Sequence, residues 1–254
     1  MTSSAISTTT LTEHVVLVTG AAKRLGAALI RGFHAEGARV AIHFHRSAED
    51  AESLARSLNA QRANSATVVP GDLRDVTALP GIVGATVRAF GRLDVLINNA
   101  STFYPTPIGQ ITPEHWDDLT GTNLKAPLFL AQAAEPHLRA SRGLIVNMID
   151  IHGYRPLPHH PVYSAAKAGL MMLTKSLARE LSPEVRVNGI APGPILWPEG
   201  GIDAKLKEEI IDKTMLKRSG SPDDIVRAAL FFAKDAPYVT GQILSVDGGR
   251  SIGW

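Results

Sequence analysis

Residues 14–26, HVVLVTGAAKRLG, place a short apolar run directly before a glycine-containing turn and the start of a helix. The run is rich in valine and leucine with little alternation of polar residues, as in a strand buried on both faces. The turn from Thr19 to Gly26 presents backbone N–H groups at a helix N-terminus, where a pyrophosphate binds well. We therefore predict the first strand and helix of a nucleotide-binding α/β fold, although close packing alone also selects such a turn.

The same order of strand and helix repeats along the rest of the chain. Short apolar runs alternate with helix-length segments, which is typical of a parallel sheet covered by helices on both faces. The predicted strands lie near residues 14–19, 39–44, 66–70, 93–98, 143–150, 185–190 and 242–246. The predicted helices lie near residues 25–36, 48–59, 76–90, 113–139, 162–181 and 222–234. The predicted fold class is α/β, a doubly wound parallel sheet of seven strands with helices on both faces.

The composition narrows the chemistry available to the chain. Among its 254 residues are 26 Lys and Arg, 24 Asp and Glu, and no Cys. The lack of cysteine excludes disulfides, thiolate zinc sites, cysteine-ligated iron–sulfur clusters and thiol nucleophiles, and it fits a reducing cytoplasm. A formal net charge of +2 gives no general basis for binding nucleic acid or an anionic membrane. No segment approaches the ~20 apolar residues of a membrane span.

No linker composition divides the chain, so we expect a single domain over residues 13–254. Residues 1–12 are rich in serine and threonine and lack the basic and apolar parts of a signal peptide, so we expect a disordered N-terminal lead. The segment 191–201, APGPILWPEGG, opens a loop over about 191–215 that we expect to contact the substrate. A surface loop without a role is the alternative.

The end of the second predicted strand indicates which cofactor the turn binds. NAD-binding proteins usually carry Asp or Glu there for the ribose 2′-OH, whereas this chain has His45, Arg46 and Ser47. Arg46 can pair with a 2′-phosphate, and Ser47 can donate a hydrogen bond from a helix N-terminus. Lys23 and Arg24 add positive charge from the first turn. The pattern favours NADPH over NADH, with a solvated surface arginine as the alternative for Arg46.

Tyr163 and Lys167 are spaced by four residues at the start of a predicted helix, so their side chains lie on one face a turn apart. Asp150 ends the strand before this helix, and Asn98 and Asn99 end the preceding strand, so these groups converge at the carboxyl edge of the sheet. The Lys167 ammonium is expected to lower the pKa of Tyr163 from about 10 and to hydrogen-bond a nicotinamide ribose. The alternative for Asp150 is a structural cap or an ion pair.

Four motifs follow one another along the chain: Thr19-Gly20-x-x-x-Arg24-x-Gly26, Asn98-Asn99-Ala100, Tyr163-x-x-x-Lys167 and Pro192-Gly193. Together they resemble the short-chain dehydrogenase/reductase family, in its order and spacing, from about residue 15 to residue 249. The resemblance implies a single Rossmann domain with strand order 3-2-1-4-5-6-7, hydride transfer with a nicotinamide cofactor and, commonly, a homotetramer. It also implies catalytic roles for Asn123, in a chain of waters, and for Tyr163 and Lys167.

At three positions the chain departs from the family pattern. There it resembles one branch of the family, the pteridine reductases. Arg24 replaces the middle glycine, Ser101 replaces the glycine after Asn-Asn-Ala, and Asp150 replaces the usual catalytic serine. The residues that the motifs and this resemblance assign to the cofactor are Gly20, Lys23, Arg24, Leu25, Gly26, His45, Arg46, Ser47, Asp72, Leu73, Asn99, Ala100, Ser101, Tyr163, Lys167, Pro192 and Gly193. Those assigned to the substrate are Arg24, Ser101, Phe103, Asp150 and Tyr163.

Asp150 and Phe103 lead to the functional prediction. An ionised carboxylate opposes the charge that develops on a ketone oxygen, whereas reduction of a pterin C=N bond requires a proton at a ring nitrogen. Phe103 can stack on a flat heterocycle, with simple packing on the domain as the alternative. We predict NADPH-dependent reduction of dihydropterins, with dihydrofolate and oxidised pterins as further candidate substrates. The alternatives are a carbonyl or 3-oxoacyl thioester reductase and a non-catalytic NADPH-binding regulatory protein.

Two further features complete the sequence predictions. His152, His159 and His160 lack the companion residues of a metal site, so no metal is expected. Pterin, monapterin and folate share one ring and differ in a tail that Trp197 and its loop are expected to contact. An exposed Trp254 would be unfavourable, so we expect it to pack at a subunit interface.

Overall fold

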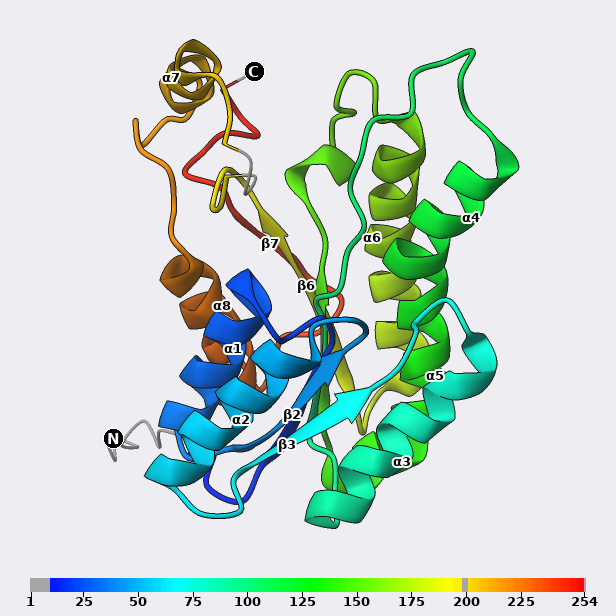
Figure 1. The fold of residues 1–254 in the computed structure, drawn as a ribbon, viewed down its shortest axis with the longest axis vertical. Coiled ribbons are helices and arrows are strands. Elements are labelled where there is room, and N and C mark those ends of the chain that lie inside the picture. Colours follow the sequence, from blue (N-terminus) through cyan, green and yellow to red (C-terminus); the bar gives the residue numbers. More distant parts are fainter. Residues whose placement is uncertain (1–9, 198–200, 254) are drawn as a thin grey trace, which may run out of the picture.

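The computed structural model describes residues 10–197 and 201–253. Within them, seven strands form one sheet in the order β3-β2-β1-β4-β5-β6-β7, and every neighbouring pair is parallel (Figure 1). The predicted fold class and strand order are confirmed. The strands are β1 (Val15–Val18), β2 (Arg39–Phe44), β3 (Ala66–Pro70), β4 (Val95–Asn98), β5 (Leu144–Met148), β6 (Arg186–Pro192) and β7 (Ile243–Val246).

The first strand lies in the middle of the sheet, and its sequence explains this position. Val16 and Val18 belong to the core on one face, while Val15 and Leu17 belong to the core on the other. Successive side chains of a strand point to opposite faces, so an unbroken apolar run supplies both cores. The strand order reverses beside β1, between β1 and β4, and ligands of such sheets bind outside the carboxyl ends of the strands at this point.

Helices cover both faces of the sheet (Figure 1). One face carries α1 (Arg24–Ala35), α2 (Ala48–Gln61) and α8 (Pro222–Lys234). The other face carries α3 (Leu79–Phe90), α5 (Ala126–Ser141) and α6 (Pro161–Leu181). The side chains of each helix that face the sheet are apolar, so burying them against the strands drives the layered arrangement.

The predicted helix over residues 113–139 is interrupted in the structure. It consists of α4 (Pro113–Thr120), a π-helical turn η2 (Gly121–Lys125) and α5. A regular helix would need Pro127 to donate a backbone hydrogen bond to the carbonyl of Asn123, which a proline cannot do. A π turn absorbs such a break, and turns of this kind are frequent at functional sites.

The predicted loop over about 191–215 contains a helix, α7 (Ala204–Asp212). Asp203 begins it by accepting a hydrogen bond of 3.0 Å from the Leu206 N–H. None of its residues is fully buried, but Leu206 and Ile210 are spaced by four residues, so an apolar pair at helical spacing was present in the sequence and our prediction missed it. It lies at the top of Figure 1, on the side of the molecule where the strands end.

The N-terminal boundary lies earlier than predicted. Leu11, which we assigned to a disordered lead, is fully buried in the core beneath α1 and α8, because its apolar side chain fills that space. Residues 1–9 and Trp254 lie outside the described residues. Among the helices that are described, none combines the length and apolar character needed to cross a bilayer.

Candidate active site

A cleft of about 970 Å³ opens at the carboxyl edge of the sheet, beside the point where the strand order reverses. Its volume is in the upper part of the range for small-molecule and cofactor sites. Asn123 is buried in η2 and does not line the cleft. Every other residue that the sequence assigns to the site does: Gly20, Lys23, Arg24, Leu25, Gly26, His45, Arg46, Ser47, Asp72, Leu73, Asn99, Ala100, Ser101, Phe103, Asp150, Tyr163, Lys167, Pro192 and Gly193.

The turn after β1 can be formed only with glycine at two positions. Gly20 adopts a φ of +60°, and a Cβ there would lie 3.0 Å from the Ala100 Cα. A Cβ at Gly26 would overlap the Gly20 carbonyl and lie 2.8 Å from Nδ2 of Asn99. The turn therefore packs closely against the N-terminus of helix α1, the position at which α/β folds bind phosphate.

His43, on β2, supports this turn from below and was not predicted. Its Nδ1 accepts a hydrogen bond of 3.1 Å from the Gly20 N–H, and its Nε2 donates one of 3.2 Å to the Gly71 carbonyl. Burial lowers the pKa of His43 to about 4, so the ring is neutral at physiological pH and its proton sits on Nε2. A histidine within the apolar run of residues 40–44 was the sequence signal for this role.

The carboxyl end of β2 places two basic residues, His45 and Arg46, at one end of the cleft, and the end of β3 places Asp72 beside them. His45, Arg46 and Ser47 line the cleft directly after β2. His45 Nε2 lies 3.7 Å from Oδ2 of Asp72, which follows β3. Lys23 lines the same end, but its ammonium pairs with Asp50 of α2 at 3.0 Å, so part of its charge is neutralised within the protein.

Arg24 connects the glycine turn to the segment after β6. Its φ of 51° is left-handed, and its Nη2 donates a hydrogen bond of 2.9 Å to the Trp197 carbonyl. This contact joins residues that are 173 positions apart and holds the start of the expected substrate loop beside the glycine turn.

The Asp150 carboxylate lies between a short helix and Tyr163. Its Oδ1 accepts a hydrogen bond of 2.8 Å from the His152 N–H at the start of the 3-10 helix η3 (Ile151–Gly153). Its Oδ2 accepts one of 2.8 Å from the Tyr163 hydroxyl. The cap anticipated as an alternative role for Asp150 is therefore present, but it occupies only one carboxylate oxygen.

The pKa of Tyr163 shifts in the direction opposite to our prediction. Burial and the negative charge of Asp150 raise the pKa of Tyr163 well above 10, while hydrogen bonding with Ser101 opposes the shift. The prediction that Lys167 would lower this pKa is wrong, because burial and Asp150 outweigh the lysine. The Lys167 ammonium lies 5.6 Å from the centre of the Tyr163 ring and donates to the Met148 carbonyl at 3.0 Å. Burial lowers the pKa of Lys167 to about 8.

Residues 101–104, which we call the strap, run along the cleft after β4. Ser101 Oγ donates a hydrogen bond of 2.6 Å to Oδ1 of Asn123, whose Nδ2 donates to the Thr102 carbonyl at 2.9 Å. Asn123 thus holds the strap from behind in this structure. Phe103 is 54% exposed, with its ring edge-on to Tyr163 at a centroid distance of 4.8 Å. Its degree of exposure argues against the alternative that Phe103 only packs on the domain.

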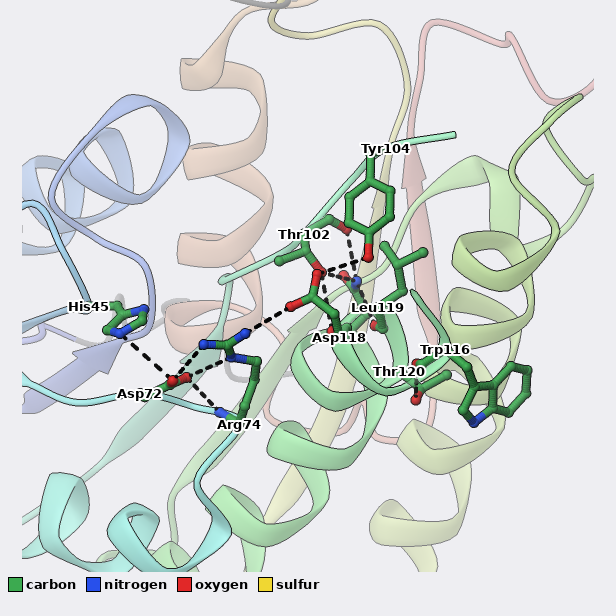
Figure 2. A network of polar contacts seen from close by, with 10 residues as sticks. His45, Asp72, Arg74, Thr102, Tyr104, Trp116, Asp118, Leu119 and Thr120 are labelled. Carbon is green, nitrogen blue, oxygen red and sulfur yellow. Dashed lines mark hydrogen bonds and ion pairs between the residues drawn. The ribbon is translucent and has the colours of Figure 1, made fainter. Parts of the chain in front are cut away.

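A network of polar contacts that the sequence did not predict lies along one wall of the cleft (Figure 2). Arg74 pairs with Asp72 at 2.8 Å and with Asp118 of α4 at 3.3 Å. Asp118 also accepts a hydrogen bond of 3.0 Å from the Tyr104 hydroxyl. Asp72 and Arg74 are close in sequence, but Tyr104 and Asp118 come from other segments, and no motif spacing connects them to Arg74.

Comparison with known proteins identifies the family. The family profile described as enoyl-(acyl carrier protein) reductase matches residues 20–251, nearly the whole chain. The chain belongs to the short-chain dehydrogenase/reductase family. Members of this family are oxidoreductases that generally use NAD(P)H, and the cleft lies where their shared fold binds a dinucleotide.

Two relatives from the short-chain dehydrogenase/reductase family are named for different substrates. Pteridine reductase 1 of Leishmania tarentolae is 38% identical, over 96% of this chain and 99% of the relative. A 3-oxoacyl-[acyl-carrier-protein] reductase, FabG, of Staphylococcus aureus is 35% identical, over 92% of this chain and 96% of the relative. The two identities are too similar to indicate which substrate this chain uses. The substrate therefore has to be inferred from individual residues of the cleft.

Proposed function

We propose that the protein is a pteridine reductase that uses NADPH to reduce dihydropterins, with dihydrofolate and oxidised pterins as further candidate substrates. The observation that carries the proposal is the Asp150 carboxylate, which holds the Tyr163 hydroxyl in a cleft beside the exposed ring of Phe103. The family's usual serine at this position would stabilise a developing oxyanion, whereas a carboxylate would repel it. A ring nitrogen, which receives a proton, suits this site better.

The residues at the other end of the cleft fit NADPH. Glycine at positions 20 and 26 lets the turn pack against the N-terminus of α1, where backbone N–H groups would hold the pyrophosphate, because a side chain at either position would collide with neighbouring residues. Arg46 and Ser47 would hold the 2′-phosphate by charge-assisted hydrogen bonds, with His45 beside them. NADPH, when bound, supplies the hydride for the pterin ring carbon.

Tyr163 and Asp150 would supply the protons. Tyr163 is protonated at neutral pH, so its hydroxyl carries a proton that one ring nitrogen can receive. Asp150 would return a proton to Tyr163 or relay one from water to the second nitrogen in a two-stage reduction. Lys167, buried beside the Tyr163 ring, would offset the charge of the phenolate and hydrogen-bond the nicotinamide ribose.

Phe103 would form one wall of the substrate slot. Its ring stacks on His160 at a centroid distance of 4.7 Å with the planes 9° apart, which fixes its orientation. A flat heterocycle can therefore lie against the ring without a further loss of side-chain freedom. Arg24 and Ser101 would contact the polar edge of the heterocycle or the cofactor phosphate.

We also propose a cytoplasmic homotetramer built from one domain, which includes the buried Leu11 and so begins before the predicted residue 13. The cysteine-free composition supports a reducing compartment. Two sets of exposed apolar side chains on different elements support two separate interfaces, as a closed tetramer with dihedral symmetry requires. One set is Trp116, Leu128 and Met172, and the other is Phe231, Tyr238 and Leu244. Sedimentation as a monomer would contradict this assembly.

The function is tested by following NADPH absorbance after adding dihydrobiopterin, dihydromonapterin or dihydrofolate to the purified protein. We expect oxidation of NADPH with at least one of them and much slower oxidation of NADH. Turnover of an acetoacetyl thioester or a ketone alone would support the carbonyl reductase alternative instead. Methotrexate is expected to raise the melting temperature of the NADPH complex. It would have no such effect on a regulatory protein without a pterin slot.

A further inference from the structure

Arg74 joins two carboxylates that both line the cleft, Asp72 after β3 and Asp118 of α4 (Figure 2). Its Nε and Nη2 donate hydrogen bonds of 3.1 and 2.8 Å to the two carboxylate oxygens of Asp72. Its Nη1 donates one of 3.3 Å to Oδ1 of Asp118. A guanidinium group is planar, so two carboxylates that bind it at separate edges hold it in a single orientation.

Asp118 continues this contact to the strap. Its second carboxylate oxygen accepts the hydrogen bond from the Tyr104 hydroxyl at 3.0 Å, and its backbone carbonyl accepts one from Thr102 Oγ1 at 3.5 Å. These two bonds fall on either side of Phe103 in the sequence. A shift of Asp118 therefore moves the segment that carries the exposed ring of Phe103.

Asp72 lies at the opposite end, on the adenosine side of the cleft. It follows β3 and is 3.7 Å from His45, which follows β2. In doubly wound sheets, the adenosine ribose lies at the end of the second strand. Hydrogen bonds from Arg74 lower the pKa of Asp72 to about 2, so both partners are charged at all physiological pH values.

We propose that Arg74 is a positioning residue, which transmits occupancy of the adenosine side to the substrate slot through Asp118 and the strap. The inference rests on the proposed function, because it concerns the coupling of cofactor and substrate in the same cleft. Side chains of Arg74, Asp72 and Asp118 are 45%, 33% and 27% exposed. Water screens such pairs, so they hold the strap weakly while the cleft contains only solvent.

Occupancy of the adenosine side changes this balance. A ligand placed against Asp72 and Arg74 excludes water and lowers the local dielectric constant, which strengthens both ion pairs. Asp118 and the strap are then held more firmly, so the substrate slot is better formed. By linkage, a ligand in the slot must tighten binding at the adenosine side by the same factor.

The test uses two ligands that cannot touch each other. Adenosine 2′,5′-bisphosphate carries the adenosine and the 2′-phosphate but no nicotinamide, so it reaches only the adenosine side. Methotrexate is the probe for the substrate slot. Calorimetry gives the Kd of methotrexate with and without saturating bisphosphate for the wild type, Arg74→Met and Arg92→Met. Arg92 is a matched control, because it pairs in the same bidentate way with Asp94, two residues later, outside the cleft.

In the wild type and in Arg92→Met, the bisphosphate is expected to tighten methotrexate binding about 5-fold, at the lower end of known couplings between sites. In Arg74→Met, the ratio of the two Kd values should fall to about 1. Raising the salt concentration should reduce the ratio in the wild type, since partly exposed ion pairs are screened, and leave it unchanged in Arg74→Met. A purely structural role for Arg74 would not produce this difference.

The possible failures are distinguishable. Absence of methotrexate binding to the wild-type NADPH complex would overturn the proposed function and this inference with it. Binding of methotrexate with equal coupling in the wild type and Arg74→Met would overturn the inference alone. Tyr104→Phe removes one hydrogen bond between Asp118 and the strap and serves if Arg74→Met does not fold. Coupling as strong in Tyr104→Phe as in the wild type would likewise contradict the proposal.

Discussion

The Tyr163 hydroxyl donates a hydrogen bond of 2.8 Å to Oδ2 of Asp150, and both side chains line the cleft. A carboxylate in this position keeps the phenol protonated, because its charge adds to the effect of burial on the pKa of Tyr163. In the proposed reaction, this proton is the one that Tyr163 donates. This arrangement suits a reduction, in which substrate atoms gain protons, and it leads to the first prediction.

Asp150→Asn and Asp150→Ser are expected to lower the kcat for dihydropterin reduction by about 100-fold or more, in the range contributed by a positioned acid–base group. The Kd of NADPH, measured by fluorescence titration, should change little, because Asp150 acts on the substrate side of the cleft. In both variants the pKa of Tyr163 should fall, since a neutral neighbour no longer opposes the phenolate.

Asp75 provides the matched control for these variants. Its Oδ1 accepts a hydrogen bond of 3.0 Å from the Thr77 N–H and so begins a 3-10 helix, as Asp150 does through His152, but it lies outside the cleft. Asp75→Asn should leave kcat unchanged. If it reduces kcat as much as Asp150→Asn does, the role of Asp150 is that of a cap alone.

Arg46→Ala is expected to raise the Kd of NADPH by about 10- to 100-fold, the loss of a hydrogen bond to a charged group. The Kd of NADH should stay nearly constant, because NADH has no 2′-phosphate for Arg46 to bind. Arg56→Ala is the control, since Arg56 lies on the exposed surface of α2 and pairs with Glu52. An equal loss of NADPH and NADH affinity in Arg46→Ala would contradict the assignment of the 2′-phosphate site.

Gly26→Ala is expected to abolish measurable cofactor binding. The added Cβ would lie 2.7 Å from the Ala21 Cα and 2.8 Å from Asn99 Nδ2, so the turn has to open and its N–H groups lose their common direction. Gly81→Ala, in α3, meets no atom within 4 Å and should stabilise the protein by about 0.5–1 kcal/mol. Titration of both variants with NADPH checks the prediction, and normal affinity in Gly26→Ala would disprove it.

The lowered pKa of His43 predicts how the free energy of unfolding depends on pH. Its pKa is about 4 in the folded protein and 6.5 when exposed, so between these values the unfolded chain binds a proton that the folded protein does not. The free energy of unfolding therefore falls as the pH drops from 6.5 to 4, by about 3 kcal/mol from this residue. Urea unfolding of His43→Gln should show a change over this range that is smaller by that amount. Equal changes in the wild type and the variant would refute the prediction.

Local patterns accounted for the sheet and for the positions of most site residues. The apolar run of β1, the glycine turn and the residues after β2 each occupy a short stretch, and parallel strands bring their carboxyl ends to one edge whatever lies between them. For this reason the cleft contains nearly every residue assigned to it in advance. Pro127 follows the interruption of the predicted helix, but Pro136 lies within α5 without ending it, so proline positions alone did not predict where the helix breaks.

Contacts between side chains from distant segments could not be predicted from such local patterns. The contact of Arg74 with Asp118 spans 44 residues, and that of Arg24 with the Trp197 carbonyl spans 173. The pKa of Tyr163 illustrates the same limit. The spacing to Lys167 indicated that a cation lies nearby, but burial and the Asp150 carboxylate outweigh it.

Periodicity and turn chemistry operate over a few residues, so the amino-acid order was sufficient to predict the seven strands, the glycine turn after β1 and the basic group after β2. Desolvation, charge pairing and the direction of each hydrogen bond depend on which groups the folded chain brings within a few ångströms. The neutral state of His43, the protonated Tyr163 and the link from Asp72 to Phe103 therefore emerged only from the packed structure.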